Sequence, residues 1–255
     1  MNPIKKAIFS TAIPFVGAMF KFCNKFINVI YYHDIVSGEG YGSQKTNIEL
    51  FKKQIQYIAS NGYKTYTFDE LNDKNILFDK KSVLITFDDG WRSNYTEIFE
   101  FMKQVNVKYN IFLEIGNIDE NPEYLTWDMV REMHSSALVG FGAHTYSHPD
   151  MSNLCDIDTF LEFDKVNQKI CDELGFLPKD FCYPFGKWSE DSNKYIIDQT
   201  PYTRIYTSDL KYSYMQNGKT IFGRNSINGD YPFSIFVNML KGHYNIFDLL
   251  RGKKN

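Results

Sequence analysis

The first candidates for chemistry are two adjacent acidic residues, Asp88 and Asp89, which directly follow an apolar run at residues 82–87. Adjacent carboxylates repel each other unless a cation lies beside them, so the pair is typical of a metal or acid–base site. The next residue is Gly90, and Asp-Gly is a common turn dipeptide. Taken alone, the pair therefore favours an ordinary turn.

Two histidines four residues apart, His144 and His148, follow another apolar run at residues 138–143. Together with one carboxylate they would form a set of three protein ligands, which leaves metal positions open for water and substrate. This spacing is a weak signal by itself. Two of only five histidines nevertheless fall at a predicted strand end, as the carboxylates do, and this combination favours a metal site.

Two further segments carry candidate groups. His33 ends an apolar run at residues 26–32 and is either a general acid or a hydrogen-bonded loop residue. The turn at residues 183–186 (YPFG) follows a short apolar run. It either directs a backbone N–H towards the metal as an oxyanion donor or is a rigid turn with a packed ring.

The elements that must position these groups alternate between strands and helices. Strands are predicted at residues 26–32, 82–87, 107–113, 138–143, 181–183, 204–207 and 220–227, and helices at 47–61, 95–105, 126–133, 156–174, 189–198 and 235–240. Strand–helix units repeated about seven times predict an α/β fold, a closed or nearly closed barrel of parallel strands in a single domain. In such barrels the chemistry gathers at the carboxyl ends of the strands.

Composition excludes several classes of protein. The chain has 255 residues, of which 43% are apolar and 23% charged, as expected of a globular domain. Its net charge is -3 and no basic block is longer than the short C-terminal one, residues 251–254, so no nucleic-acid partner is expected. The four cysteines lack a CxxC pair, which argues against a cysteine-based zinc site or a disulfide-dense scaffold.

Residues 1–25 form a separate N-terminal apolar segment. Lys5 and Lys6 precede an apolar run at residues 7–20, which is too short to cross a bilayer comfortably. The pattern favours a signal peptide or a membrane-associating helix over an ordinary helix packed on the domain. We therefore expect a protein of the cell envelope, exported or membrane-associated, with the cytoplasmic face of the membrane left open.

Three segments together resemble the ordered motifs of the polysaccharide deacetylases (carbohydrate esterase family 4, the NodB-homology fold). These segments are Thr86-Phe-Asp-Asp-Gly90, His144-Thr-Tyr-Ser-His148 and Tyr183-Pro-Phe-Gly186. The resemblance runs from about residue 29 to residue 227. It implies a distorted (β/α)7-type barrel, with residues 26–255 as the catalytic domain.

The resemblance also implies a role for each motif. Asp88 would be the general base, and Asp89, His144 and His148 the ligands of one divalent metal ion. That ion is usually Zn²⁺, although related enzymes accept others. Phe185, Pro184 and Tyr183 would contact the substrate and its oxyanion, with the backbone N–H of Phe185 helping to bind the oxyanion.

The chain departs from the common family pattern at two points. Many members carry an arginine that supports the base where this chain has Cys182, and many carry a late Leu-x-His motif that is missing here. The segment Tyr32-His33-Asp34 is instead similar to the poly-N-acetylglucosamine deacetylase branch, in which the early histidine replaces the missing acid. We therefore expect His33 to be the general acid and Arg224 to take the place of the lost arginine.

The expected function is metal-dependent removal of N-acetyl groups from the sugars of a surface or envelope polysaccharide, with release of acetate. The departures keep two alternatives open. One is a barrel that binds glycan without cleaving it, and the other is a metal-dependent esterase or amidase that acts on another acetylated substrate.

Overall fold

A computed structural model of the chain describes residues 26–39, 42–73, 75–79, 81–153, 156–208 and 213–242. The predicted N-terminal segment, residues 1–25, lies outside these ranges, so its role as an export signal or membrane-associating helix stays a prediction. Within the described ranges, no helix combines the length and the apolar character needed to cross a membrane.

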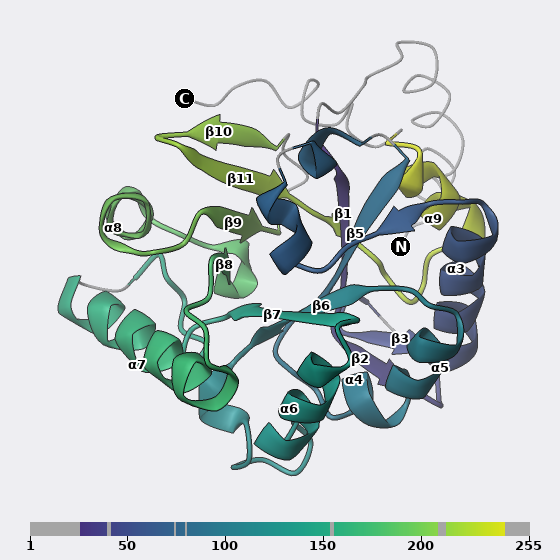
Figure 1. Ribbon diagram of the computed structural model, residues 1–255, viewed down its shortest axis with the longest axis horizontal. Helices are drawn as coiled ribbons and strands as arrows, with labels where there is room; N and C mark the ends of the chain where they lie inside the picture. Colours follow the sequence, from purple (N-terminus) through teal and green to yellow (C-terminus); the bar gives the residue numbers. More distant parts are fainter. Residues whose placement is uncertain are drawn as a thin grey trace.

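The centre of the molecule is a large sheet (Figure 1). Its strands are β1 (Asn28–Tyr32), β4 (Lys64–Thr65), β5 (Ser82–Phe87), β6 (Tyr109–Leu113), β7 (Val139–Ala143), β8 (Asp180–Cys182), β9 (Arg204–Thr207), β10 (Tyr214–Gln216), β11 (Lys219–Gly223) and β12 (Asn225–Ser226). The order is β10-β11-β9-β8-β7-β6-β5-β1-β12, and β4 pairs with β5. All pairs in it are parallel except β10 with β11.

One continuous stretch of chain connects the two opposite edges of the parallel part of the sheet. β11 pairs with β9, whereas β12 pairs with β1 on the far side, yet only Arg224 separates β11 from β12. The sheet therefore curves round until this stretch bridges its first and last parallel strands. The prediction of a distorted (β/α)7-type barrel is confirmed. The predicted continuous strand at residues 220–227 is interrupted at Arg224, because the chain leaves one neighbouring strand there and joins another.

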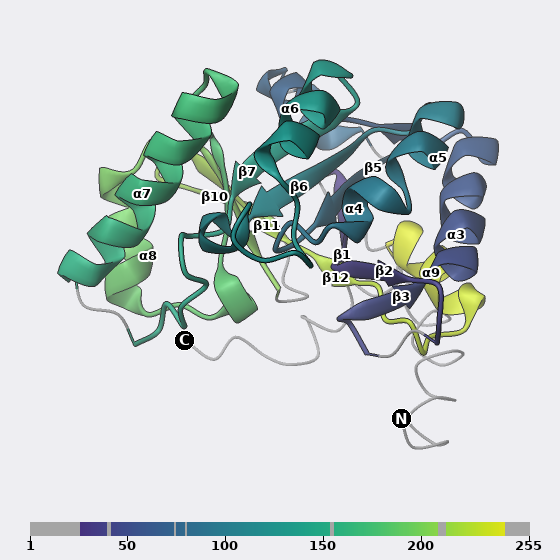
Figure 2. The same cartoon turned by 90° about the horizontal axis from the view of Figure 1, so that it is seen from below.

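Helices cover the outside of the sheet, with α7 and α8 on one side and α3 and α5 on the other (Figures 1 and 2). Their bounds are α3 (Ile48–Ser60), α4 (Ser93–Thr96), α5 (Phe99–Gln104), α6 (Trp127–Ser135), α7 (Asp156–Leu174), α8 (Glu190–Gln199) and α9 (Phe233–Leu240). Single turns of 3-10 helix are η2 (Asp69–Asn72), η3 (Ile76–Phe78), η4 (Ile115–Asn117) and η5 (Pro184–Gly186), and β2 (Asp34–Val36) pairs with β3 (Lys45–Asn47).

Side-chain caps set the start of three predicted helices. The Asn47 side chain accepts hydrogen bonds from the first turn of α3, Thr126 caps α6, and Ser189 caps α8. The single helix predicted at residues 95–105 is wrong, because the chain forms two short helices, α4 and α5. They are separated at Ile98, which has a non-helical backbone and a fully buried side chain.

Alternation along the strands sorts apolar side chains into two layers. In β5, Val83 and Ile85 belong to the layer beneath the helices, whereas Leu84 points into the barrel. The barrel interior is filled by aromatic rings. Phe112 and Tyr206 lie 4.9 Å apart between centroids, and Phe222 stacks on Tyr206 at 4.9 Å. The polar groups at the strand ends lie directly above this packed apolar interior.

Candidate metal and active site

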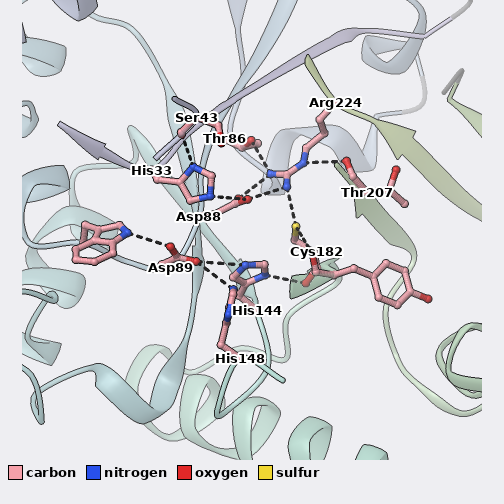
Figure 3. Close-up of polar contacts among 12 residues, drawn as sticks. His33, Ser43, Thr86, Asp88, Asp89, His144, His148, Cys182, Thr207 and Arg224 are labelled. Atoms are coloured by element: carbon pink, nitrogen blue, oxygen red, sulfur yellow. Dashed lines mark hydrogen bonds and ion pairs between the residues drawn. The ribbon is translucent and has the colours of Figure 1, made fainter. Parts of the chain in front are cut away.

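Polar side chains from separate strands meet at the carboxyl end of the barrel (Figure 3). Asp88 and Asp89 follow β5, His144 follows β7, and His33 follows β1. Parallel strands place these ends at one edge, so residues far apart in the sequence become neighbours. Figure 3 shows the side chains of His33, Asp88, Asp89, His144 and His148 pointing towards one another.

Asp89, His144 and His148 form a cluster with the geometry of a metal site. Asp89 Oδ1 lies 3.4 Å from Nε2 of His144 and 3.4 Å from Nε2 of His148. Two donors at typical zinc distances from one tetrahedral ion lie roughly 3.3 Å apart, so this spacing fits. Asp89 Oδ1 is buried and accepts no hydrogen bond from the part of the chain that the structure describes. A buried, unpaired carboxylate oxygen that faces two imidazole nitrogens favours a bound cation.

Neighbouring groups orient two of these ligands. The indole Nε1–H of Trp91 donates a 3.0 Å hydrogen bond to Asp89 Oδ2, which leaves Oδ1 directed at the histidines. His144 Nδ1–H donates to the Cys182 carbonyl at 2.8 Å, which directs its Nε2 towards Asp89. Burial and the neighbouring His144 lower the pKa of His148 to about 4, which keeps its ring neutral and able to bind a metal.

A second group of donors, Asp88, His144 and Cys182, also lies close together. It is less suited to a cation, because Arg224 Nη2 lies 2.9 Å from Cys182 Sγ and 2.8 Å from Asp88 Oδ2. Burial also raises the pKa of the Cys182 thiol, which opposes the thiolate that a metal requires. The set of Asp89 and the two histidines is therefore the better metal site.

Asp88 is held by a buried arginine that enters from the point of barrel closure. Arg224 Nη1 donates to Asp88 Oδ1 at 2.7 Å and Nη2 donates to Oδ2 at 2.8 Å, and the arginine is fully buried. Its Nη1 and Nε also reach the Thr86 hydroxyl and the Thr207 carbonyl, each at 3.2 Å. Burial by itself would raise the pKa of Asp88, but the guanidinium outweighs burial and lowers that pKa. The carboxylate is therefore ionised at neutral pH.

His33 lies beside Asp88 with one ring nitrogen already engaged. Its Nδ1–H donates to the Ser43 carbonyl at 2.8 Å, and its Nε2 lies 3.9 Å from Asp88 Oδ2. The side chain is almost wholly buried. This arrangement leaves Nε2 as the nitrogen that faces the site and can exchange a proton there.

In the third motif, residues 183–186, the Phe185 ring is exposed, whereas Tyr183 and Pro184 are buried. Phe185 is 61% exposed, and its ring centroid lies 4.5 Å from that of His148. Tyr183 is buried and donates its hydroxyl to Asn193 Oδ1 at 3.0 Å, and Pro184 is also buried. The Tyr183 side chain therefore anchors the turn and does not face the site. The role of the Phe185 N–H as an oxyanion donor stays a prediction.

Sequence reasoning missed two residues beside the candidate metal site, Trp91 and Glu114. Glu114 directly follows β6, so the strand-end rule that singled out Asp88 could have found it. Its side chain is buried, and burial together with the charge of Asp89 raises the pKa of Glu114 to about 7. Trp91 carries no comparable signal, because its hydrogen bond to Asp89 depends on the turn that follows β5.

Comparison with known proteins identifies relatives that are named as deacetylases of N-acetylglucosamine polymers. The chain is 29% identical over 176 residues to the peptidoglycan-N-acetylglucosamine deacetylase of Bacillus cereus, covering 68% of this chain and 60% of that protein. It is 25% identical over 181 residues to the poly-beta-1,6-N-acetyl-D-glucosamine N-deacetylase of Staphylococcus aureus, covering 64% of this chain and 61% of the relative. The chain spans about half to two thirds of the length of three curated relatives that it matches, the peptidoglycan-N-acetylglucosamine deacetylase among them.

The fold is similar to that of the Streptococcus pyogenes deacetylase PplD in complex with acetate. The TM-score is 0.74 at 21% sequence identity, and the match covers 85% of this chain and 99% of PplD. The protein-family model for polysaccharide deacetylases matches residues 77–205, just over half of the chain. That range contains both acidic residues, both histidines and the third motif. The chain therefore belongs to the polysaccharide deacetylase family.

Proposed function

We propose that this protein is a metal-dependent hydrolase that removes N-acetyl groups from the sugars of a surface or envelope polysaccharide and releases acetate. The observation that carries the proposal is the convergence of Asp89, His144 and His148 beside a second carboxylate, Asp88, that is held separately by Arg224. A structural metal site would not need this fourth, independently oriented group. A hydrolytic site needs both a metal and a base.

Asp89, His144 and His148 would hold one divalent ion, for which we propose Zn²⁺ because the donors are imidazole nitrogen and carboxylate oxygen. Such an ion, when bound, polarises a carbonyl oxygen and lowers the pKa of an attacking water. The protein supplies the remaining chemistry through Asp88, His33 and the third motif.

In the proposed reaction, Asp88 accepts a proton as water adds to the acetyl carbon. The Phe185 N–H stabilises the negative charge on the acetyl oxygen. The C–N bond then breaks, and protonated His33 gives its Nε2 proton to the departing nitrogen. The products are acetate and a sugar with a free amino group. Because His33 Nε2 lies 3.9 Å from Asp88 Oδ2, a small movement lets the proton pass between them and restores both groups.

The names of the relatives support N-acetylglucosamine as the shared unit of the substrate, in peptidoglycan in one case and in a β-1,6-linked polymer in the other. We propose the cell envelope as the location for the same reason. Membrane association through residues 1–25 is a further proposal, which cell fractionation with and without this segment would test.

The proposal is tested by measuring metal content and acetate release from N-acetylglucosamine oligomers for the wild type, His144→Ala and His134→Ala. His134 lies on α6 and packs against Phe176, away from the site, so it is the matched control. We expect one bound divalent ion and acetate release in the wild type and in His134→Ala. In His144→Ala we expect the metal to be lost and the rate to fall by on the order of 10³-fold, since the metal contributes several kcal/mol to catalysis.

Each alternative function gives a different result. Bound metal without acetate release from any N-acetylated glycan would favour a barrel that only binds glycan. Faster release from O-acetylated than from N-acetylated sugars would favour an esterase. Acetate release that persists without metal would contradict the proposal.

A further inference from the structure

The loop that carries both histidine ligands, residues 144–148, is held from two sides. On one side its carbonyl groups accept hydrogen bonds from η4. Ile115 N–H donates to the Thr145 carbonyl at 3.3 Å, and Gly116 N–H donates to the Tyr146 carbonyl at 2.7 Å. The N–H groups of Tyr146 and Ser147 find their acceptor on the other side, in helix α7.

That acceptor is the carboxylate of Glu162, which takes three hydrogen bonds from the loop. Oε2 accepts from the backbone N–H of Tyr146 at 2.9 Å and of Ser147 at 2.8 Å, and Oε1 accepts from the Ser147 hydroxyl at 2.7 Å. Successive backbone N–H groups in a turn form a small anion-binding concavity, and hydrogen bonds to an ionised acceptor are the strong ones. Lys165, one turn further along α7, lies 4.9 Å from the Tyr146 ring centroid on the same side.

The loop needs this support because its backbone is strained. Thr145 has φ 67° and His148 has φ 55°, in the left-handed region that non-glycine residues rarely adopt. Such conformations persist only where the surrounding structure imposes them. Glu162 bonds to the two residues between these strained positions.

The two histidine ligands depend on the loop to different extents. His144 is buried at the end of β7, and its Nδ1–H is bound to the Cys182 carbonyl. The His148 side chain is 20% exposed, and no hydrogen bond to its ring is found among the described residues. The position of His148 is therefore set by the backbone of the loop, together with ring contacts to His144 and Phe185. Glu162 holds this backbone from α7, and the Thr145 hydroxyl holds it by accepting from the His148 N–H at 3.1 Å.

We propose that Glu162 is a positioning residue for the metal site, holding residues 145–148 in the strained conformation that brings His148 Nε2 to Asp89. This inference deepens the proposed function and rests on its metal site. According to this inference, the outer helix α7 contributes to metal affinity through the histidine loop, although α7 supplies neither the metal ligands nor the base. Loss of such outer-shell partners typically weakens metal binding about 10- to 100-fold.

The test compares three variants with the wild type. Glu162→Ala removes the acceptor. Glu162→Gln keeps the shape and can still accept from both backbone N–H groups, so it is the conservative rescue. Asp164→Asn removes the same charge from an exposed position on the same helix and is the matched control. For each, the dissociation constants of Zn²⁺ and Co²⁺ are measured by titration, the visible spectrum of the Co²⁺ form is recorded, and thermal unfolding is followed without metal.

We expect Glu162→Ala to lower the affinity for Zn²⁺ and for Co²⁺ by about 10- to 100-fold. The Co²⁺ spectrum should also change, because His148 no longer occupies its place. Glu162→Gln should recover part of this loss, and Asp164→Asn should bind metal like the wild type. Wild-type metal affinity and spectrum in Glu162→Ala, even with a lower unfolding temperature, would reduce Glu162 to a structural contact and overturn the inference.

These readouts separate the inference from the proposed function. A wild type that binds metal but releases no acetate would overturn the deacetylase proposal, while the effect of Glu162 on metal affinity would still be decided. A wild type that binds no divalent metal would overturn both. Equal losses of metal affinity in Glu162→Ala and Asp164→Asn would also contradict the inference, because the cause would then be the net charge of α7.

Discussion

At the scale of single residues, Asp88 and Asp89 are neighbours in the chain with different environments. Asp89 Oδ1 is directed at two histidine nitrogens, whereas both oxygens of Asp88 are occupied by Arg224. A bidentate arginine fixes the direction of a carboxylate as well as its charge, and lysine cannot reproduce that geometry. The proposed roles, metal ligand for Asp89 and base for Asp88, therefore have a physical basis in the different partners of the two carboxylates.

Arg224→Lys is expected to lower kcat by about 10²-fold with little change in KM, because Asp88 loses its orientation while substrate contacts remain. Steady-state kinetics of acetate release measure this. Arg204→Lys is the matched control, since Arg204 is also buried and bidentate to Asp180 but lies where β9 begins, at the opposite end of the barrel. It should lower the unfolding temperature and spare kcat. Equal kcat losses in both variants would contradict a specific role for Arg224.

At the scale of elements, the site depends on contacts between loops that follow different strands. η4 follows β6, the histidine loop follows β7, and the two touch where the Gly116 N–H meets the Tyr146 carbonyl at 2.7 Å. A β-carbon on residue 116 would lie 2.7 Å from that carbonyl oxygen, closer than such atoms approach. Glycine at this position is required by the close packing of the two loops.

Gly116→Ala is therefore expected to destabilise the fold by about 1–3 kcal/mol, the usual cost of overpacking, and to weaken metal binding by displacing the histidine loop. Chemical denaturation and metal titration measure the two effects. Gly38→Ala is the control, because a β-carbon there would meet nothing within 4 Å. An unchanged stability and metal affinity in Gly116→Ala would show that the loops adjust freely.

At the scale of the whole molecule, the stability of the folded protein is linked to pH through Glu114. The folded protein holds the Glu114 proton up to a pKa of about 7, whereas an ordinary glutamate has a pKa of 4.5. Between these values the folded state binds more protons than the unfolded state, so this group makes stability fall as pH rises. Above pH 7 the ionised side chain is buried beside Asp89, which is unfavourable.

Glu114→Gln is expected to raise the unfolding temperature of the metal-free protein at pH 8, because the buried charge is removed. At pH 4.5 the difference from the wild type should be small, since Glu114 is then neutral in the folded state and only half ionised in the unfolded state. Thermal unfolding between pH 4.5 and 8 in the presence of a chelator measures this difference. A difference that does not grow between pH 5 and 7 would contradict the raised pKa of Glu114.

Much of the fold could be predicted from the sequence because its signals are local. The strands at residues 82–87 and 204–207 were predicted with the bounds that the structure has, since each is a short run rich in β-branched and aromatic residues. Asn47, Thr126 and Ser189 marked helix starts because a side-chain cap acts within one turn. The break at Ile98 was missed because residues 95–105 contain no glycine or proline that would mark it.

The sequence by itself singled out Asp88, Asp89, His144 and His148, because the acidic pair and the histidine segment each follow an apolar strand and parallel strand ends share one edge. The resemblance to the polysaccharide deacetylases then implied which of them would be the base and which the metal ligands. Tertiary structure alone decided what surrounds them. Arg224 was suggested as a substitute for the missing arginine, but its bond to Asp88 spans 136 residues and exists only because the chain crosses from β9 to β1 at that point. The bond from Glu162 to the histidine loop likewise depends on how α7 packs. Contacts of this kind leave no local pattern, since their energy arises only when the barrel is assembled.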